Sequence, residues 1–129
     1  MGAKEDGVQY LQENAKKDHV NVTASGLHYE VLKEGSGAKP GPTDTFEFNY
    51  RGTFINGKQF DSSFDRGQTI EFPLNGVIAG WTEGLQLMSI GSRYRFFIPY
   101  HLGYGESGAA GVIPPFSALI FEVDLIDVK

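Results

Sequence analysis

The sequence lacks cysteine, has no long apolar run, and carries fewer basic than acidic residues. Without cysteine, the chain forms no disulfide, thiolate metal site or cysteine nucleophile. No run approaches the ~18 apolar residues of a membrane-spanning helix, so we expect no membrane partner. Eleven Lys and Arg stand against sixteen Asp and Glu, for a net charge of −5. Because phosphate binding needs clustered basic side chains, this balance argues against a nucleic acid partner.

Aromatic side chains, by contrast, are plentiful. The 129 residues include ten Phe, six Tyr and one Trp. A chain of this length folds as one domain and removes roughly two thirds of its unfolded surface from water. Each buried ring contributes a large apolar area, so the sequence predicts a core rich in rings.

The chain divides into an N-terminal helix remnant with a linker, residues 1–24, and a main domain, residues 25–129. Residues 4–17 are charged, with a thin apolar stripe at helical spacing, which predicts a short, frayed helix. Residues 18–25 have the composition of a linker. The stripe consists of Val8, Leu11 and Ala15.

Within the main domain, apolar and polar residues alternate in five segments, which predicts five half-buried strands. The dipeptide Asn56-Gly57 indicates a tight antiparallel hairpin between Phe54 and Phe60. The five alternating sets start at Leu27, Phe46, Ile70, Tyr94 and Leu119.

One segment departs from this alternation, with apolar residues at spacings of three, four and three. Such spacing predicts one face of a short helix, and Gly91 suits its end. A single amphipathic helix packed on antiparallel strands makes an α+β fold, with Trp81 pointing between helix and sheet. The helical set is Ile78, Trp81, Leu85 and Met88.

Residues 103–108 match the letters of the G-x-G-x-x-G dinucleotide motif. That motif needs a parallel strand before it and a helix after it. Residues 109–115 end in a diproline and are not expected to begin a helix. The glycines therefore favour a tight surface loop that presents Tyr104.

Other catalytic chemistry finds little support. The three histidines, at positions 19, 28 and 101, have no partner at metal-ligand spacing, so no metal site is expected. Ser62-Ser63 has neither a strained elbow nor a matching histidine, which disfavours hydrolysis. Four carboxylates on polar strand faces and turns are interpreted as solvated. These are Glu30, Glu34, Glu122 and Asp124.

Three long blocks resemble the FKBP-type peptidyl-prolyl cis-trans isomerases, also called immunophilins. They are NYRGTFINGKQFDSSFDRG, EFPLNGVIAGWTEGLQLMSIGSRYRFFIP and LGYGESGAAGVIPPFSALIFEVDLI, all within residues 25–129. The resemblance implies a five- to six-stranded antiparallel half-barrel sheet wrapped around one short helix.

The upstream block YLQENAKKDHVNVTASGLHYEVLKEGSG is similar to the linker helix and first strand of the bacterial macrophage infectivity potentiator subgroup. In that subgroup a further N-terminal helical domain makes a homodimer. The resemblance therefore implies an isolated catalytic domain that is monomeric. It favours a bacterial periplasm or cell envelope over the cytoplasm.

The resemblance also implies an aromatic pocket that acts on Xaa-Pro bonds without metal or cofactor, with Trp81 as its floor. Macrolides such as rapamycin and tacrolimus are the implied inhibitors. Ile70, where many members carry an aromatic residue, and Ala109, where some carry histidine, bear on affinity. The implied catalytic residues are Tyr50, Phe60, Asp61 and Tyr104. The implied substrate-binding residues are Arg66, Phe72, Val77, Ile78, Trp81, Ile113 and Phe121.

Fold alone does not guarantee chemistry. A non-catalytic peptide-binding or chaperone module on the same fold is the alternative hypothesis. The joint presence of Asp61, Trp81 and Tyr104 favours the enzyme.

Overall fold

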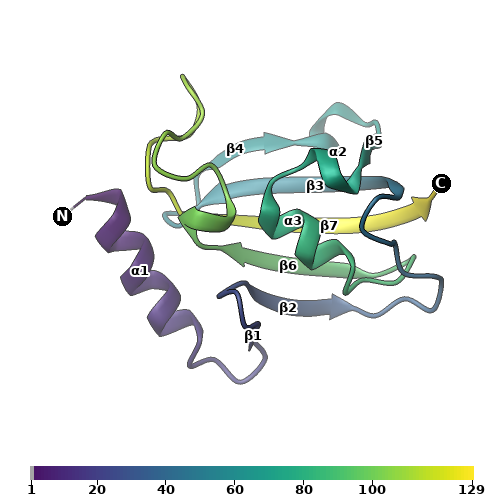
Figure 1. Ribbon diagram of the computed structural model, residues 1–129, viewed down its shortest axis with the longest axis horizontal. Helices are drawn as coiled ribbons and strands as arrows, with labels where there is room; N and C mark the ends of the chain where they lie inside the picture. Colours follow the sequence, from purple (N-terminus) through teal and green to yellow (C-terminus); the bar gives the residue numbers. More distant parts are fainter. Residues whose placement is uncertain (1) are drawn as a thin grey trace.

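The computed structural model describes residues 2–129 as one antiparallel sheet with helix α3 across one face (Figure 1). The strands lie in the order β1-β2-β6-β7-β3-β4, and β5 also pairs with β3. The elements are α1 (Ala3–Asn14), β1 (Asn21–Val22), β2 (His28–Lys33), β3 (Thr45–Phe54), β4 (Gln59–Ser62), α2 (Ser63–Arg66), β5 (Ile70–Pro73), the 3-10 turn η1 (Leu74–Gly76), α3 (Ala79–Leu85), β6 (Arg93–Ile98), the 3-10 turn η2 (Tyr100–Leu102) and β7 (Leu119–Val128).

The predicted α+β fold and its five strands are confirmed, as β2, β3, β5, β6 and β7. The sheet has seven strands rather than five or six, because β1 and β4 join it. β1 lies inside the predicted linker and pairs with β2. β4 follows the predicted Asn56-Gly57 hairpin and pairs antiparallel with β3. Gly57 has φ of +89°, a conformation that glycine adopts without steric cost.

The core fills the space between α3 and the face of the sheet that it covers. Alternate side chains of the central strands, such as Phe46, Phe96 and Val123, are completely buried there. Burial of each such side chain contributes about 1.5–3 kcal/mol. Trp81 and Leu85 on α3 are also buried, as predicted, whereas Ile78 is the half-buried N-cap and the buried Met88 lies beyond the end of the helix. The helix itself is shorter than predicted and ends before Gly91, which lies in the turn that precedes β6.

The interpretation as solvated is wrong for Glu30, Glu122 and Asp124, because these three carboxylates belong to cross-strand ion pairs on the outer face. Arg95 donates from Nη1 to Glu30 Oε1 at 2.9 Å and from Nη2 to Glu122 Oε1 at 2.7 Å. The Glu30 side chain is only 12% exposed. The third pair is Arg93 with Asp124. Glu34, which follows β2, is exposed as predicted and accepts a hydrogen bond from the Tyr94 hydroxyl.

The short helix predicted in residues 4–17 is confirmed as α1, and its apolar stripe is only partly covered: Val8 and Ala15 are exposed, and Leu11 is half-buried. The buried residues of this helix are Gly7 and Asn14. Gly7 packs against Ala118, and Asn14 Nδ2 lies 3.3 Å from His28 Nδ1 on β2. Small and polar residues, together with the Tyr10 ring 6.5 Å from that of Phe97, therefore hold α1 in place, which the spacing of the stripe does not reveal.

This contact predicts a dependence of stability on pH. Burial lowers the pKa of His28, so the folded chain favours the neutral imidazole. In the unfolded chain His28 has its ordinary pKa of about 6.5, so as the pH falls the unfolded chain binds a proton before the folded chain does. The contribution of neutral His28 to the free energy of unfolding is therefore complete above about pH 6.5 and is lost as the pH falls through the pKa of His28 in the folded chain. Urea unfolding between about pH 7 and about pH 5 should show a falling midpoint that is less steep in His28→Gln.

The matched control is His101→Gln, because His101 is exposed. This control should keep the slope of the wild-type chain. Equal slopes for the wild-type chain and His28→Gln would contradict the prediction.

Candidate functional site

A cavity of about 470 Å³ opens between the sheet and the start of α3. Seven of its lining residues are aromatic, and one is a carboxylate. The lining consists of Phe48, Tyr50, Phe60, Asp61, Phe72, Gly76, Val77, Ile78, Trp81, Tyr104 and Phe121.

Trp81 forms the floor of this cavity. Its indole is 6% exposed and meets three rings edge-on, at centroid distances of 5.0 Å to Phe48, 5.5 Å to Tyr50 and 5.1 Å to Phe121. Edge-to-face pairs of this kind favour one ring geometry over others. The floor is therefore held in place before any ligand binds.

Beside the floor, Ile78 occupies the N-cap position of α3. Its carbonyl accepts from the backbone N–H of Trp81 at 3.0 Å, whereas its own N–H donates to no group within residues 2–129. A free N–H at the edge of an apolar cavity is a donor for a ligand carbonyl.

Asp61 is held by two donors. Arg66 donates from Nη1 to Asp61 Oδ1 at 2.7 Å, and the Tyr50 hydroxyl donates to the other carboxylate oxygen. Burial raises the pKa of Asp61, but the hydrogen bonds from Tyr50 and Arg66 outweigh burial and hold this pKa below its ordinary value. Burial and the bond to Asp61 raise the pKa of Tyr50. At neutral pH the site therefore contains a carboxylate and a protonated phenol.

The short helix α2 places Arg66 beside Asp61. The Ser62 side chain caps α2 by accepting from the Asp65 N–H at 3.3 Å. The Ser63 hydroxyl donates to Asn49 Oδ1 at 2.9 Å and accepts from the Tyr50 N–H at 2.8 Å. Both serines thus have structural contacts, in agreement with the argument against hydrolysis.

Gly52 allows the rings of Phe60 and Phe121 to meet. A Cβ atom at Gly52 would lie 2.6 Å from Phe60 Cζ and 2.8 Å from Phe121 Cε1, too close for real contacts. The two rings lie edge-to-face at 5.6 Å. The bare backbone at this position therefore lets Phe60 reach the cavity.

Nine of the eleven predicted site residues line the cavity. The other two are Arg66, which contacts Asp61 and Tyr50, and Ile113, which is buried in the adjoining core. Sequence reasoning missed Phe48 and Gly76 as lining residues. The alternation of β3 already placed Phe48 on the inner face, whereas Gly76 gave no signal.

The loop of residues 103–108 consists mainly of turns, and the segment after it is not helical. This arrangement lacks the parallel strand and the helix that a dinucleotide site requires. Instead, the loop exposes Tyr104 at the cavity, as predicted.

Residues 2–129 contain no cluster of three or more His, Asp or Glu side chains able to hold a metal ion. None of the described helices has the length and apolar character needed to cross a membrane.

A family model described as FKBP-type peptidyl-prolyl cis-trans isomerase matches residues 36–126. The chain belongs to this family. A second model, described as the domain amino terminal to FKBP-type peptidyl-prolyl isomerase, matches residues 1–31. The family predicted from the sequence is therefore confirmed.

Bacterial members of the FKBP family are similar over nearly the whole chain. The FKBP-type 22 kDa peptidyl-prolyl cis-trans isomerase of Escherichia coli K12 is 53% identical, over 95% of this chain and 60% of that protein. The peptidyl-prolyl cis-trans isomerase Mip of Coxiella burnetii is 48% identical, over 93% of this chain and 52% of that protein. The chain thus spans about half the length of these relatives, and the predicted likeness to the infectivity potentiator subgroup is confirmed.

Solved structures of FKBP-type proteins share the fold. FkpA from Escherichia coli matches with a TM-score of 0.94 and 44% identity, over 98% of this chain and 59% of that one. A peptidyl-prolyl cis-trans isomerase from Pseudomonas syringae matches with a TM-score of 0.92 and 36% identity, over 98% of this chain and 93% of that one.

Proposed function

We propose that this chain is an active prolyl isomerase, which accelerates rotation about Xaa-Pro bonds in peptides and folding proteins. Its site supports the proposal through one observation above all. An aromatic cavity with Trp81 as its floor contains a single carboxylate, Asp61, that Tyr50 and Arg66 hold in one orientation.

The energetics of amide rotation explain why such a cavity suits this reaction. Rotation about an amide costs ~18–20 kcal/mol, because the twisted state loses resonance. Xaa-Pro bonds populate both isomers and exchange in roughly tens to hundreds of seconds unaided. The twisted amide has lost its charge separation and is less polar than the planar one. A cavity that excludes water therefore stabilises the twisted state relative to the planar state.

The required stabilisation is modest. Even an acceleration of about 10⁵-fold corresponds to only about 7 kcal/mol. Neither a nucleophile nor a proton transfer is needed, since rotation makes and breaks no covalent bond. Apolar contact and a few fixed hydrogen bonds are sufficient.

The prolyl ring is assigned to the floor formed by Trp81, between the side chains of Val77 and Phe121, with Phe72 at the mouth and Phe60 beside Phe121. Ile113 is buried in the same core cluster as Trp81 and Phe121, and Pro114-Pro115 fixes the backbone next to it.

Two donors anchor one side of the rotating bond in this scheme. The free N–H of Ile78 and the hydroxyl of Tyr104 bind substrate carbonyls. Asp61 faces the rotating carbonyl, whose carbon becomes more electron-poor as resonance is lost. The carboxylate therefore stabilises the twisted state more than the planar state, while Tyr50 and Arg66 keep it oriented.

Exchange NMR on an Ala-Leu-Pro-Phe peptide tests the proposed activity. At catalytic concentrations of the chain, we expect cis and trans resonances to broaden through faster exchange. Unchanged line widths in the presence of folded chain would remove the isomerase assignment.

The second candidate function is a peptide-binding or chaperone module without catalysis. The exposed side chains of Phe72, Tyr104 and Val112 favour it, because they offer apolar contact to an unfolded polypeptide. The same NMR experiment separates the two functions, since this module would shift peptide resonances without accelerating exchange.

We also propose that rapamycin and tacrolimus bind the cavity. The aromatic lining around Trp81 supports this, and Trp81 is the sole tryptophan. A fluorescence titration should therefore report binding directly. The effect of Ile70 and Ala109 on this affinity, the monomeric state and the envelope location remain predictions.

A further inference from the structure

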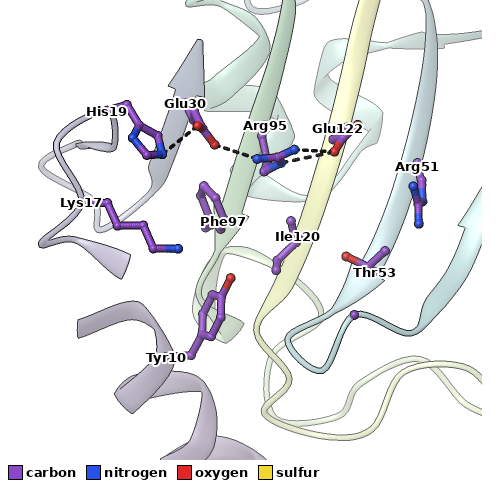
Figure 2. A pocket seen from close by; sticks show the side chains of 11 residues that line it. Tyr10, Lys17, His19, Glu30, Arg51, Thr53, Arg95, Phe97, Ile120 and Glu122 are labelled. Carbon is purple, nitrogen blue, oxygen red and sulfur yellow. Dashed lines mark hydrogen bonds and ion pairs between the residues drawn. The ribbon is translucent and has the colours of Figure 1, made fainter. Parts of the chain in front are cut away.

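A second cavity, of about 320 Å³, lies between α1 and the outer face of the sheet (Figure 2). Strand alternation places it on the opposite side of the sheet from the cavity around Trp81, because Tyr50 lines that cavity and the next residue, Arg51, lines the second one. We propose that this second cavity, the outer-face pocket, binds an extended polypeptide segment in which carboxylate side chains flank an apolar one.

The charges of the outer-face pocket are unbalanced. Both of its carboxylates are already paired: Glu122 with Arg95 at 2.7 Å, and Glu30 with Arg95 and with His19 Nε2, each at 2.9 Å. Figure 2 shows these side chains as one row along the outer face. The pairing leaves no carboxylate of the row free for a further cation.

Two cations of the pocket lack such a partner. Lys17 and Arg51 form no ion pair within residues 2–129. Arg51 lies opposite Glu122 in the strand register, but the Glu122 carboxylate binds Arg95 instead. Counting Arg95, three cationic side chains face two carboxylates, in a chain whose net charge is −5. This local excess of positive charge favours an anionic ligand.

The centre of the pocket is apolar. Phe97 and Ile120 are register partners on β6 and β7, and the Tyr10 ring lies 6.5 Å from the Phe97 ring. In Figure 2, Lys17 extends from the side of α1 and Arg51 lies at the far side on β3, with Phe97 and Ile120 between them. An apolar side chain with a carboxylate on either side matches this order. Phe97 is only 4% exposed, so the half-buried Ile120 provides the apolar contact that inorganic phosphate could not use.

The pocket also offers free hydroxyls. Those of Tyr10 and Thr53 have no hydrogen-bond partner within the part of the chain that the structure describes. A hydroxyl both donates and accepts, so these groups suit the backbone of an extended segment. Burial raises the pKa of Tyr10, which keeps its hydroxyl protonated.

The test is an NMR titration of the ¹⁵N-labelled chain with the proline-free, end-blocked peptide Gly-Glu-Phe-Glu-Gly. We expect the amide resonances of Thr53, Phe97 and Ile120 to shift, while the indole resonance of Trp81 stays in place. The neutral peptide Gly-Gln-Phe-Gln-Gly should bind about tenfold more weakly, since charge-assisted hydrogen bonds are lost. Added salt should also weaken binding of the acidic peptide.

Variants locate the site. The double charge reversal Lys17→Glu with Arg51→Glu should lower the affinity for the acidic peptide by about tenfold or more and leave prolyl isomerisation unchanged. Lys39→Glu is the matched control, an exposed reversal outside the pocket, and should keep the affinity.

Several results would overturn the proposal. These are equal binding of the two peptides, wild-type affinity in the double variant, or shifts confined to the cavity around Trp81. No binding at millimolar peptide would also overturn it, as would equal shifts with phosphate alone or binding of phosphatidylglycerol vesicles in place of the peptide. The proposal stands on the outer face and survives a failure of the proposed isomerase function.

Discussion

Replacing Trp81 with alanine should lower kcat/KM for an Xaa-Pro peptide by about a hundredfold or more, and macrolide affinity by a similar factor. The indole is the floor on which the prolyl ring is proposed to rest, and it fixes three neighbouring rings. Its removal opens the apolar cavity to water, which stabilises the planar amide. A hundredfold loss corresponds to about 2.7 kcal/mol of transition-state stabilisation.

The same change should cost about 3–5 kcal/mol of unfolding free energy, a large share of the roughly 5–15 kcal/mol that holds a domain together. Activity is therefore compared with that of Leu85→Ala. Leu85 lies on the same helix and is completely buried, but it does not line the cavity. Leu85→Ala should lose stability and keep turnover per folded molecule.

A second variant, Trp81→Phe, keeps an aromatic floor and should retain part of the activity. Exchange NMR and calorimetry provide the measurements, since indole fluorescence is absent from both Trp81 variants. Full activity in folded Trp81→Ala would show that the cavity is wrongly assigned.

Asp61→Ala should reduce kcat/KM by about tenfold to a hundredfold, mainly through kcat, because the carboxylate is proposed to act in the twisted state. Its effect on unfolding free energy should stay below about 1 kcal/mol. The Asp61 side chain is 40% exposed, and exposed ion pairs such as that with Arg66 contribute little to stability. Turnover and urea unfolding, measured together, separate the two effects.

Asp65→Ala is the matched control for Asp61→Ala. It removes a carboxylate four residues away that does not line the cavity, and it should leave turnover unchanged. Because the pKa of Asp61 lies below its ordinary value of about 3.9, wild-type turnover should be level from about pH 8 to about pH 5. Turnover should fall only when a lower pH protonates this carboxyl. Identical kinetics in Asp61→Ala and wild type would exclude the proposed role.

Strand periodicity predicted most of the sheet because the inner faces are so regular. Phe46 and Phe48 on β3 alternate strictly with polar residues, and both are buried. Alternation did not reveal two strands: β1 has only two residues, and β4 is mostly polar and was indicated only by the Asn56-Gly57 hairpin signal. The packing of α1 through Gly7 and Asn14 was missed because those contacts depend on close approach rather than on hydrophobicity.

Prediction of the site residues depended on more than strand periodicity. The family resemblance identified most of the lining, because its motifs concentrate on the segments that enclose Trp81. The outer-face ion pairs were missed since they follow from register, which places Arg95 directly between Glu30 and Glu122. Register is a property of the folded sheet and is absent from any one segment.

The consecutive positions of Tyr50 and Arg51 on β3 restrict how this strand can change in length. Side chains alternate between faces, so deletion of one residue just before Tyr50 would turn this part of the strand inside out. The guanidinium group would then point at the indole and the phenol at solvent. Both cavities would be lost in a single step, although no residue in contact with a ligand had been substituted.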